Sequence, residues 1–264
     1  MKKILALLTL FSAVNIILAI PVTAEDITIV GTGSGVPVLK AIGRAFTLAN
    51  PEISVNIPPS IGSGGGIKTV GKDEYIIGRV ARPIKDGEKH YGLSYVPIAK
   101  MPVVFFVNRN VGLKNISSST VCDIYSGKIR NWKDAGGKSA RVRVVRRENG
   151  DSSLSVLLKS FKGFKEITIT KRSKITFNDQ KTLELIEKKA NTIAFGTYGN
   201  AINYKVDILN IDGINPVDNE YKIFGALALI FKEKNNTGSL KKFVEFVTSD
   251  AAVHAIKKAG GIPF

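Results

Sequence analysis

The sequence has few of the side chains that metal sites and redox sites require. Its 264 residues include one cysteine, Cys122, and two histidines, His90 and His254. A single cysteine excludes an internal disulfide, a multi-thiolate metal site and CxxC redox chemistry. We expect Cys122 to be a buried apolar residue. No HExxH motif and no His/Cys cluster indicates zinc, so we expect no metal and no cofactor.

The chain also lacks the common catalytic motifs. Ser34 and Ser63 do not lie in GxSxG, because Thr32 and Ile61 occupy the first glycine position. Val36 stands where a dinucleotide-binding turn needs Gly or Ala, and no glycine-rich turn ends in the GK[ST] of a P-loop. We therefore expect no catalytic residues and no enzyme. An exported hydrolase is the less favoured alternative.

Acidic residues are in the minority. The chain has 22 Asp and Glu against 38 Lys and Arg, with a formal net charge of +16. The basic residues come at most in adjacent pairs, as at Arg146-Arg147, and no block is typical of a nucleic-acid-binding tail. We expect no nucleic-acid partner. The charge suits a small anionic ligand, or simply a solvated surface.

No apolar run after residue 20 is long enough to cross a bilayer. At the N-terminus, Lys2 and Lys3 precede an apolar run from Ile4 to Ile20, and small residues follow up to Ala24. This order predicts a secretory signal peptide over residues 1–24, cleaved before Glu25, and a periplasmic location. The alternative is an uncleaved membrane anchor, because the run is close to the shortest length that spans a bilayer.

Three glycine- and serine-containing turns are the main positive signal. They lie at residues 31–37 (GTGSGVP), 61–66 (IGSGGG) and 146–153 (RRENGDSS), each between an apolar run and a segment with helical spacing of apolar residues. A helix start exposes unpaired N–H groups and a partial positive charge. Arg147 adds a fork of donors that fits an oxyanion. The three turns predict a single anion site.

Strand and helix patterns alternate along the chain and predict an α/β fold. Apolar runs at 101–107 and 223–231 indicate buried strands. Helical spacing follows residue 152 and recurs at 178–189 and 240–258, and a helix within 120–132 should stop at Gly127. A further short strand is expected at 167–169. Arg79 and Arg82 either line a cleft or are ordinary exposed arginines.

The order of motifs resembles that of the phosphate-binding periplasmic receptors of ABC importers. The resemblance rests on GTGSGVP, IGSGGGIK, GRVARPIKDGE, IYSGKIRNW, VVRRENGDSS, IAFGTYGNA and the final GGIPF, and it covers nearly the whole chain after residue 24. It implies a two-lobed Venus-flytrap fold of the second type. One lobe would comprise residues 25–105 and 221–264, and the other residues 106–220. It further implies a monomer that binds inorganic phosphate and delivers it to a membrane permease.

The resemblance also implies the residues that bind the anion. They are the matches to the family's three binding loops: Ser34, Gly35, Val36, Ser63, Gly64, Arg147, Asp151, Ser152 and Ser153. Gly35 and Val36 would contribute backbone N–H groups.

Two positions depart from the family pattern. Ala81 stands where the family has an Asp that accepts the proton of phosphate, and Asp151 stands where it has a Ser. A carboxylate beside a dianion is costly unless it accepts a hydrogen bond from the ligand. Asp151 therefore either takes over the proton-accepting role or only caps its helix and points away. The alternative is a receptor or sensor for another oxyanion: sulfate, molybdate or an organic phosphate.

Overall fold

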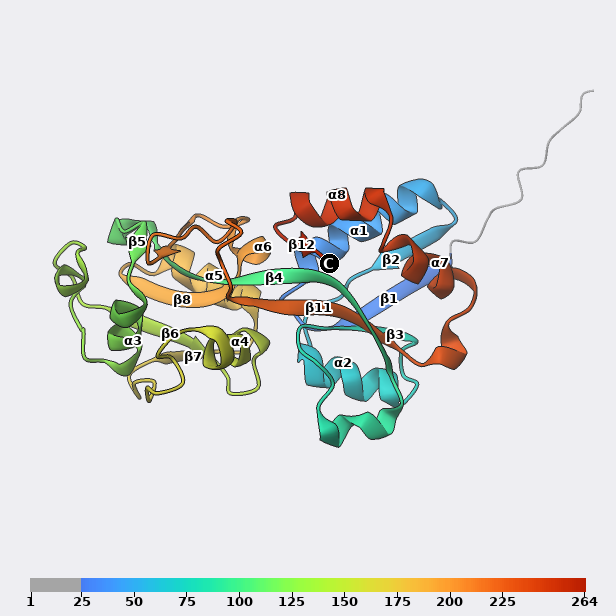
Figure 1. Cartoon of the computed structure of the whole chain (residues 1–264), viewed down its shortest axis with the longest axis horizontal. Helices are drawn as coiled ribbons and strands as arrows, with labels where there is room; N and C mark the ends of the chain where they lie inside the picture. The colour runs from blue at the N-terminus through green and yellow to red at the C-terminus, as the bar shows by residue number, and fades with distance from the viewer. Residues whose placement is uncertain (1–24) are drawn as a thin grey trace, which may run out of the picture.

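The protein has two α/β lobes joined by two long strands (Figure 1). The computed structural model describes residues 25–264, so the expected signal peptide at 1–24 lies outside the described residues. The joining strands are β4 (Ser94–Asn108) and β11 (Phe224–Phe231), which run side by side from one lobe into the other. Among residues 25–264, no helix combines the length and apolar composition needed to cross a bilayer.

The first lobe packs helices on both faces of a sheet. Its strands are β1 (Glu25–Gly31), β2 (Ile53–Asn56), β3 (Ile77–Val80) and the terminal β12 (Ile262–Pro263). Its helices are α1 (Val36–Ala49), α2 (Gly62–Gly71), α7 (Gly238–Phe246) and α8 (Asp250–Lys258). β1 is parallel to β2 and β3, as expected for strands connected through helices.

The second lobe also combines strands and helices. Its main strands are β6 (Arg143–Arg147), β7 (Lys174–Thr176) and β8 (Thr192–Thr197), and the short strands are β5 (Asn115–Ile116), β9 (Val206–Ile208) and β10 (Asn210–Ile211). Its helices are α3 (Ser118–Ser126), α4 (Ser152–Ser160), α5 (Asp179–Lys188) and α6 (Tyr198–Ala201). β6 is parallel to both β7 and β8.

The sheet order β2-β1-β3-β11-β4-β8-β6-β7 passes through both lobes. β4 changes partner along its length: Pro102 pairs with Phe224 of β11, and the next residue, Val103, pairs with Thr197 of β8. The chain thus passes between the lobes at this point, which places the ends of β6 and β8 against the first lobe.

Side-chain alternation builds the first-lobe core. Ile27 and Ile29 of β1 pack in the cluster under α1, α7 and α8, whereas Val30 packs under α2. Successive residues of a strand point to opposite faces, so both faces are buried. The second core includes Val103–Phe105 and Tyr221. These residues were expected in the first lobe, so the cores divide a few residues away from the expected bounds.

The local signals for helix ends act as expected. Asp151 caps α4 by accepting a hydrogen bond from the Leu154 N–H at 2.8 Å, and Asn178 caps α5 through the Lys181 N–H at 2.8 Å. Gly127 ends α3 with a φ of 83°, which favours glycine.

The expected α/β, two-lobed fold is confirmed. The prediction of a strand at 167–169 is wrong. Ile167 and Ile169 pack against the second core as part of a loop, because the edge of β6 pairs with β7 instead.

Candidate functional site

A cavity of about 250 Å³ lies between the lobes. It is lined by Thr32, Gly33, Ser60, Ile61, Gly62, Ser63, Arg147, Glu148, Gly150, Asp151, Ser152, Phe177 and Asp179. The starts of α2, α4 and α5 contribute to this lining. Because each helix start carries unpaired N–H groups and partial positive charge, the cavity is suited to an anion.

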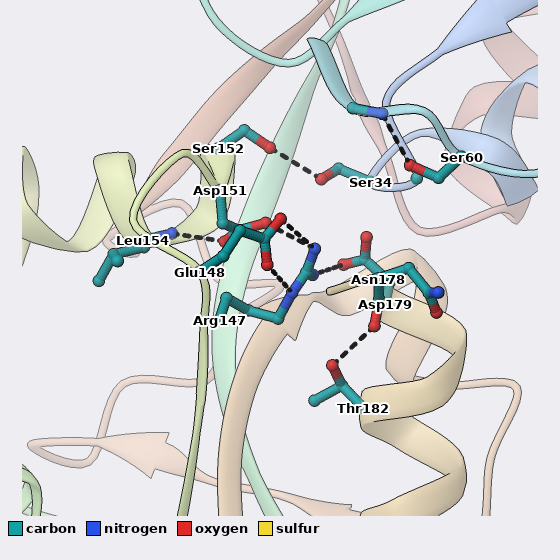
Figure 2. Close-up of polar contacts among 12 residues, drawn as sticks. Ser34, Ser60, Arg147, Glu148, Asp151, Ser152, Leu154, Asn178, Asp179 and Thr182 are labelled. Atoms are coloured by element: carbon teal, nitrogen blue, oxygen red, sulfur yellow. Dashed lines mark hydrogen bonds and ion pairs between the residues drawn. The ribbon is translucent and has the colours of Figure 1, made fainter. Parts of the chain in front are cut away.

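Arg147 is the central cation of the cavity. It ends β6 and is only 4% exposed. Its guanidinium meets three carboxylates: Asp151 Oδ2 at 3.1 Å, Asp179 Oδ1 at 3.2 Å and Glu148 Oε2 at 3.2 Å (Figure 2). One positive group therefore faces three acidic groups, so the cluster would be net negative if every carboxyl were ionised.

Burial changes the protonation of the two aspartates. It raises the pKa of Asp151 to about 7, an effect opposed by the Arg147 charge and reinforced by Asp179. Burial also raises the pKa of Asp179, again against the attraction of Arg147. Two buried acids that share one guanidinium titrate as a pair. Near neutral pH the pair can therefore hold a proton close to the cavity.

Asp151 caps its helix and also faces the cavity. Its Oδ1 caps α4 through the Leu154 N–H, while its Oδ2 contacts Arg147 (Figure 2). The cap therefore does not turn the carboxyl away from the cavity. The other acid, Asp179, approaches the first lobe so closely that a Cβ added to Gly33 would lie 2.6 Å from its Oδ2.

Polar contacts hold the first glycine turn against the second lobe. The Oγ atoms of Ser34 and Ser152 are 3.0 Å apart (Figure 2). The Thr197 hydroxyl donates to the Ser34 carbonyl at 2.9 Å, and the Asn200 amide donates to the Gly33 carbonyl at 3.2 Å. The lobes therefore touch around the turn, in a closed arrangement.

Serine hydroxyls lie in the cavity and beside it. Ser63 Oγ accepts a hydrogen bond from the Ala81 N–H at 3.1 Å, which leaves its proton free to donate. Ser153 is 1% exposed, and its hydroxyl has no hydrogen-bond partner within residues 25–264. Buried hydroxyls are normally paired, so an unpaired Ser153 is unusual; it borders a small space beside the interlobe cavity. The Ala81 methyl group lies near Ser34 and Ser153, around a space of only about 10 Å³.

The structure brings together only some of the residues expected at the site. Ser63, Arg147, Asp151 and Ser152 line the cavity, and Ser34 contacts Ser152.

Four other expected residues do not line the cavity: Gly35, Val36, Gly64 and Ser153. Gly35 faces Leu227, and the Val36 N–H donates to the Gly33 carbonyl at 3.3 Å. The Val36 N–H is therefore already hydrogen-bonded within its own turn.

The two arginines after β2 have structural partners. Arg79 is fully buried and donates to the carbonyls of Thr32 at 2.7 Å, Pro58 at 2.8 Å and Ile29. It therefore braces the two glycine turns from behind rather than lining the cavity. Arg82 forms a bidentate pair with Glu88 at 2.7 Å.

Sequence reasoning missed Asp179 and Glu148. Asp179 is the first residue of α5, and the available signal was an acid at the start of a helix that follows a strand. Glu148 directly follows the expected Arg147, but its distance from the guanidinium depends on the turn. Within residues 25–264, no group of three or more His, Cys, Asp or Glu side chains is arranged to hold a metal.

The fold is shared with a solved substrate-binding protein. The chain matches the family model described as PBP superfamily domain over residues 20–251. It therefore belongs to the PBP superfamily.

Several relatives have phosphate in their names. A solved phosphate ABC transporter substrate-binding protein with bound phosphate from Clostridium perfringens is 28% identical, with a TM-score of 0.79, and the match covers 91% of this chain and 100% of that one. The phosphate-binding protein PstS of Bacillus subtilis is 26% identical over 85% of this chain and 76% of its own length. The PstS of Borreliella burgdorferi is 23% identical over 98% of both chains.

Proposed function

We propose that this protein is an extracytoplasmic receptor that binds inorganic phosphate between its lobes and delivers it to an ABC importer. The observation that carries the proposal is the interlobe cavity, where a buried guanidinium, serine hydroxyls and three helix starts meet. The relatives named for phosphate binding support the choice of anion. In this role the protein binds its ligand without chemical change, acts as a monomer and meets a membrane permease.

In this proposal the bound ligand replaces hydrogen bonds that the closed structure makes between its own residues. We infer that phosphate replaces the mutual hydrogen bond of Ser34 and Ser152 and takes donors from Ser63, Ser153 and Arg147. In this proposal the backbone N–H groups of Gly35 and Gly64 reach the anion after a small shift of their turns. The Val36 N–H can donate to the anion only if its hydrogen bond to the Gly33 carbonyl breaks. Hydrogen bonds to a charged group contribute about 1.5–3 kcal/mol each, and micromolar affinity needs about 8 kcal/mol net.

The two aspartates fit phosphate better than sulfate. Monohydrogen phosphate carries an O–H that can donate to an ionised carboxylate, whereas sulfate near neutral pH carries none. In this proposal Asp151 and Asp179 together take the role that Ala81 cannot fill, because its methyl group neither accepts nor donates. An ionised carboxylate that faces sulfate meets only like charge, which costs affinity.

A phosphate monoester is the second candidate. The cavity volume of about 250 Å³ equals the liquid volume of roughly eight water molecules, more than a five-atom anion needs. Phe177 and Ile61, which are 72% and 49% exposed, line the same cavity and offer apolar surface to an organic substituent.

Calorimetric titration of the chain without residues 1–24 tests the function. Phosphate, sulfate, molybdate and glycerol phosphate are compared at pH 7. We expect one phosphate per chain, micromolar or tighter binding and at least 100-fold weaker binding of sulfate. Tighter binding of glycerol phosphate would assign the second candidate, and release of inorganic phosphate from it would indicate a hydrolase.

Two variants locate the site. Arg147→Ala should weaken phosphate binding at least 100-fold. The matched control is Arg146→Ala, because Arg146 is the neighbouring arginine and does not line the cavity. Equal affinity of Arg147→Ala and wild type would place the ligand elsewhere.

The role of the acids has its own test. Asp151→Asn and Asp179→Asn keep the side-chain shape and remove the charge. Each should lower the ratio of phosphate affinity to sulfate affinity about tenfold. An unchanged ratio in both variants would show that the aspartates do not accept the proton of phosphate.

A further inference from the structure

A cavity in the second lobe lies outside the interlobe site. It has a volume of about 530 Å³, within the range of small-molecule sites. It is lined by Ile124, Gly127, Ile129, Arg130, Arg141, Val142, Arg143, Val144, Val145, Thr170, Arg172, Lys174, Leu185, Lys189 and Thr192. None of these residues lines the interlobe cavity.

The two cavities lie at opposite ends of the same parallel strands. Arg143, Lys174 and Thr192, the first residues of β6, β7 and β8, line the second-lobe cavity. Arg147, the last residue of β6, lines the interlobe cavity. Four residue steps at about 3.3 Å each separate the ends of β6 by roughly 13 Å. A ligand in the second-lobe cavity would therefore not contact the interlobe anion.

The lining combines six basic residues with an apolar interior, and it contains no acidic residue. The basic residues are Arg130, Arg141, Arg143, Arg172, Lys174 and Lys189, all of which are exposed. In the described part of the chain, none of the six forms an ion pair. Uncompensated like charges around one concavity repel one another, so an anion in their midst would be stabilised by all of them.

Two of these side chains are held in place at the rim. Arg130 donates its Nε–H to the Gly127 carbonyl at 2.9 Å, and Arg143 donates from Nη1 to the Ala190 carbonyl at 2.9 Å. Each guanidinium keeps further donors free for a ligand. Fixed donors cost less conformational entropy on binding than mobile ones.

The interior differs from an ordinary solvated basic surface. Ile124, Val144 and Val145 are buried, while Ile129, Val142 and Leu185 are partly buried and remain accessible from the cavity. Apolar side chains at the bottom of a cationic rim match a molecule with an apolar body and an anionic end. Inorganic phosphate has no apolar part and gains nothing from this interior.

We propose that this second-lobe cavity binds an amphiphilic organic anion, with its alkyl or aromatic body against the apolar interior and its carboxylate or phosphate group among the rim arginines. The ligand is a free small molecule rather than a membrane surface, because the apolar groups lie inside a concavity instead of projecting from it. This site is independent of the interlobe site and does not rest on the proposed function.

Octyl phosphate is the probe. Calorimetric titration is carried out below its micelle-forming concentration, with inorganic phosphate present at saturation to occupy the interlobe site. Octyl glucoside, which has the same alkyl chain without charge, and sulfate are titrated in parallel. We expect one octyl phosphate per chain and at least tenfold weaker binding of both comparison compounds.

Three variants assign the binding to the cavity. The double variant Arg141→Glu/Arg172→Glu reverses two rim charges, and Leu185→Trp fills the interior. Each should weaken octyl phosphate binding at least tenfold and leave phosphate binding unchanged. Lys162→Glu/Lys165→Glu makes the same charge change at exposed residues of this lobe outside the cavity and should have less than a twofold effect. Thermal unfolding checks each variant, and the rim variant alone suffices if Leu185→Trp does not fold.

Several results would overturn the proposal. They are the absence of octyl phosphate binding, its loss in Arg147→Ala, and equal weakening by the rim variant and the lysine control. Recruitment of the protein to phosphatidylglycerol vesicles without binding of monomeric octyl phosphate would assign the basic residues to a membrane surface and would also refute it.

Discussion

Two buried arginines, Arg79 and Arg147, have opposite surroundings. They are 0% and 4% exposed. Arg79 donates only to backbone carbonyls, and burial lowers its pKa to about 10 because no acid compensates for lost hydration. Burial also acts to lower the pKa of Arg147, but its neighbouring carboxylates outweigh that effect and raise it.

On the proposed function, the difference separates a structural cation, Arg79, from a cation that binds the ligand, Arg147. Carbonyl groups cannot change charge, so the contacts of Arg79 are fixed and hold the two glycine turns in place. The partners of Arg147 are acids that can take up a proton, and an incoming anion can then replace their charge. Burial of an arginine therefore does not by itself mark a ligand site; the chemistry of its partners does.

The largest effect is expected from Arg79→Met. The substitution removes three donors and leaves the carbonyls of Ile29, Thr32 and Pro58 without them. Each unpaired buried group costs about 1–3 kcal/mol, partly offset because no charge is buried any longer. We expect a loss of about 4 kcal/mol in the free energy of unfolding, measured by urea titration.

Arg82→Met is the matched control for the structural arginine. Arg82 forms a bidentate pair with Glu88 in which the side chains are 12% and 21% exposed, so its loss leaves one partly hydrated carboxylate rather than three unpaired carbonyls. If Arg79→Met were no more destabilising than Arg82→Met, the bracing role of Arg79 would be wrong.

Arg147→Ala should give the reverse pattern. At pH 5.5, below the pKa of about 7 for Asp151, the removal leaves a largely protonated acid rather than an uncompensated charge. We expect the free energy of unfolding to fall by less than half of the Arg79→Met effect, while phosphate affinity falls by about 3 kcal/mol. Urea titration and calorimetry on the same samples separate the two quantities. A larger stability loss than in Arg79→Met would erase the distinction.

Gly33→Ala tests the close approach of the first glycine turn, which Arg79 holds in place, to Asp179 beside Arg147. The new methyl group would lie 2.6 Å from Asp179 Oδ2, so Asp179 must shift or the lobes must separate. We expect phosphate affinity to fall about tenfold, or about 1.4 kcal/mol. Gly87→Ala, at a position with no atom within 4 Å, should leave affinity unchanged. Unchanged affinity in both would show that this close approach is not needed for binding.

The sequence predicted the turns better than it predicted their partners. Local rules identify Gly127 as a helix stop and place Asp151 at the start of α4, because caps and glycine conformations depend on neighbouring residues. The same rules gave Arg147 at a strand end beside a helix start. These features need no knowledge of distant parts of the chain.

Long-range contacts were beyond that reasoning. The approach of Asp179 to Gly33 joins residues from different lobes, and it depends on how β6 and β7 align. The sequence left open whether Arg79 lines a cleft or is an ordinary exposed arginine, because nothing near it in sequence shows that it is buried beneath two turns. Charge patterns also gave no sign that scattered basic residues such as Arg141 and Arg172 gather around one cavity.

The smallest effect concerns the pH dependence of stability. Burial raises the pKa of Asp151 in the folded state to about 7 from an ordinary value of 3.8. Between about pH 4 and pH 7 the folded protein therefore binds more protons than the unfolded chain. Stability must fall as the pH rises through this window and level off above it. An isolated group with this shift would account for about 4 kcal/mol, but Asp179 shares the proton and lowers the share of Asp151.

Asp151→Asn should flatten this slope. Asn caps a helix as well as Asp does, so the start of α4 is kept while the charge beside Arg147 is lost. Between pH 4.5 and pH 8, we expect the free energy of unfolding to fall by about 1 kcal/mol more in wild type than in the variant. Urea titration without phosphate measures both. The matched control is Asp123→Asn, since Asp123 pairs with Lys128 at an exposed position and should leave the slope unchanged. An identical slope in Asp151→Asn and wild type would mean that the acids around Arg147 stay ionised, and that this arginine is held by fixed partners just as Arg79 is.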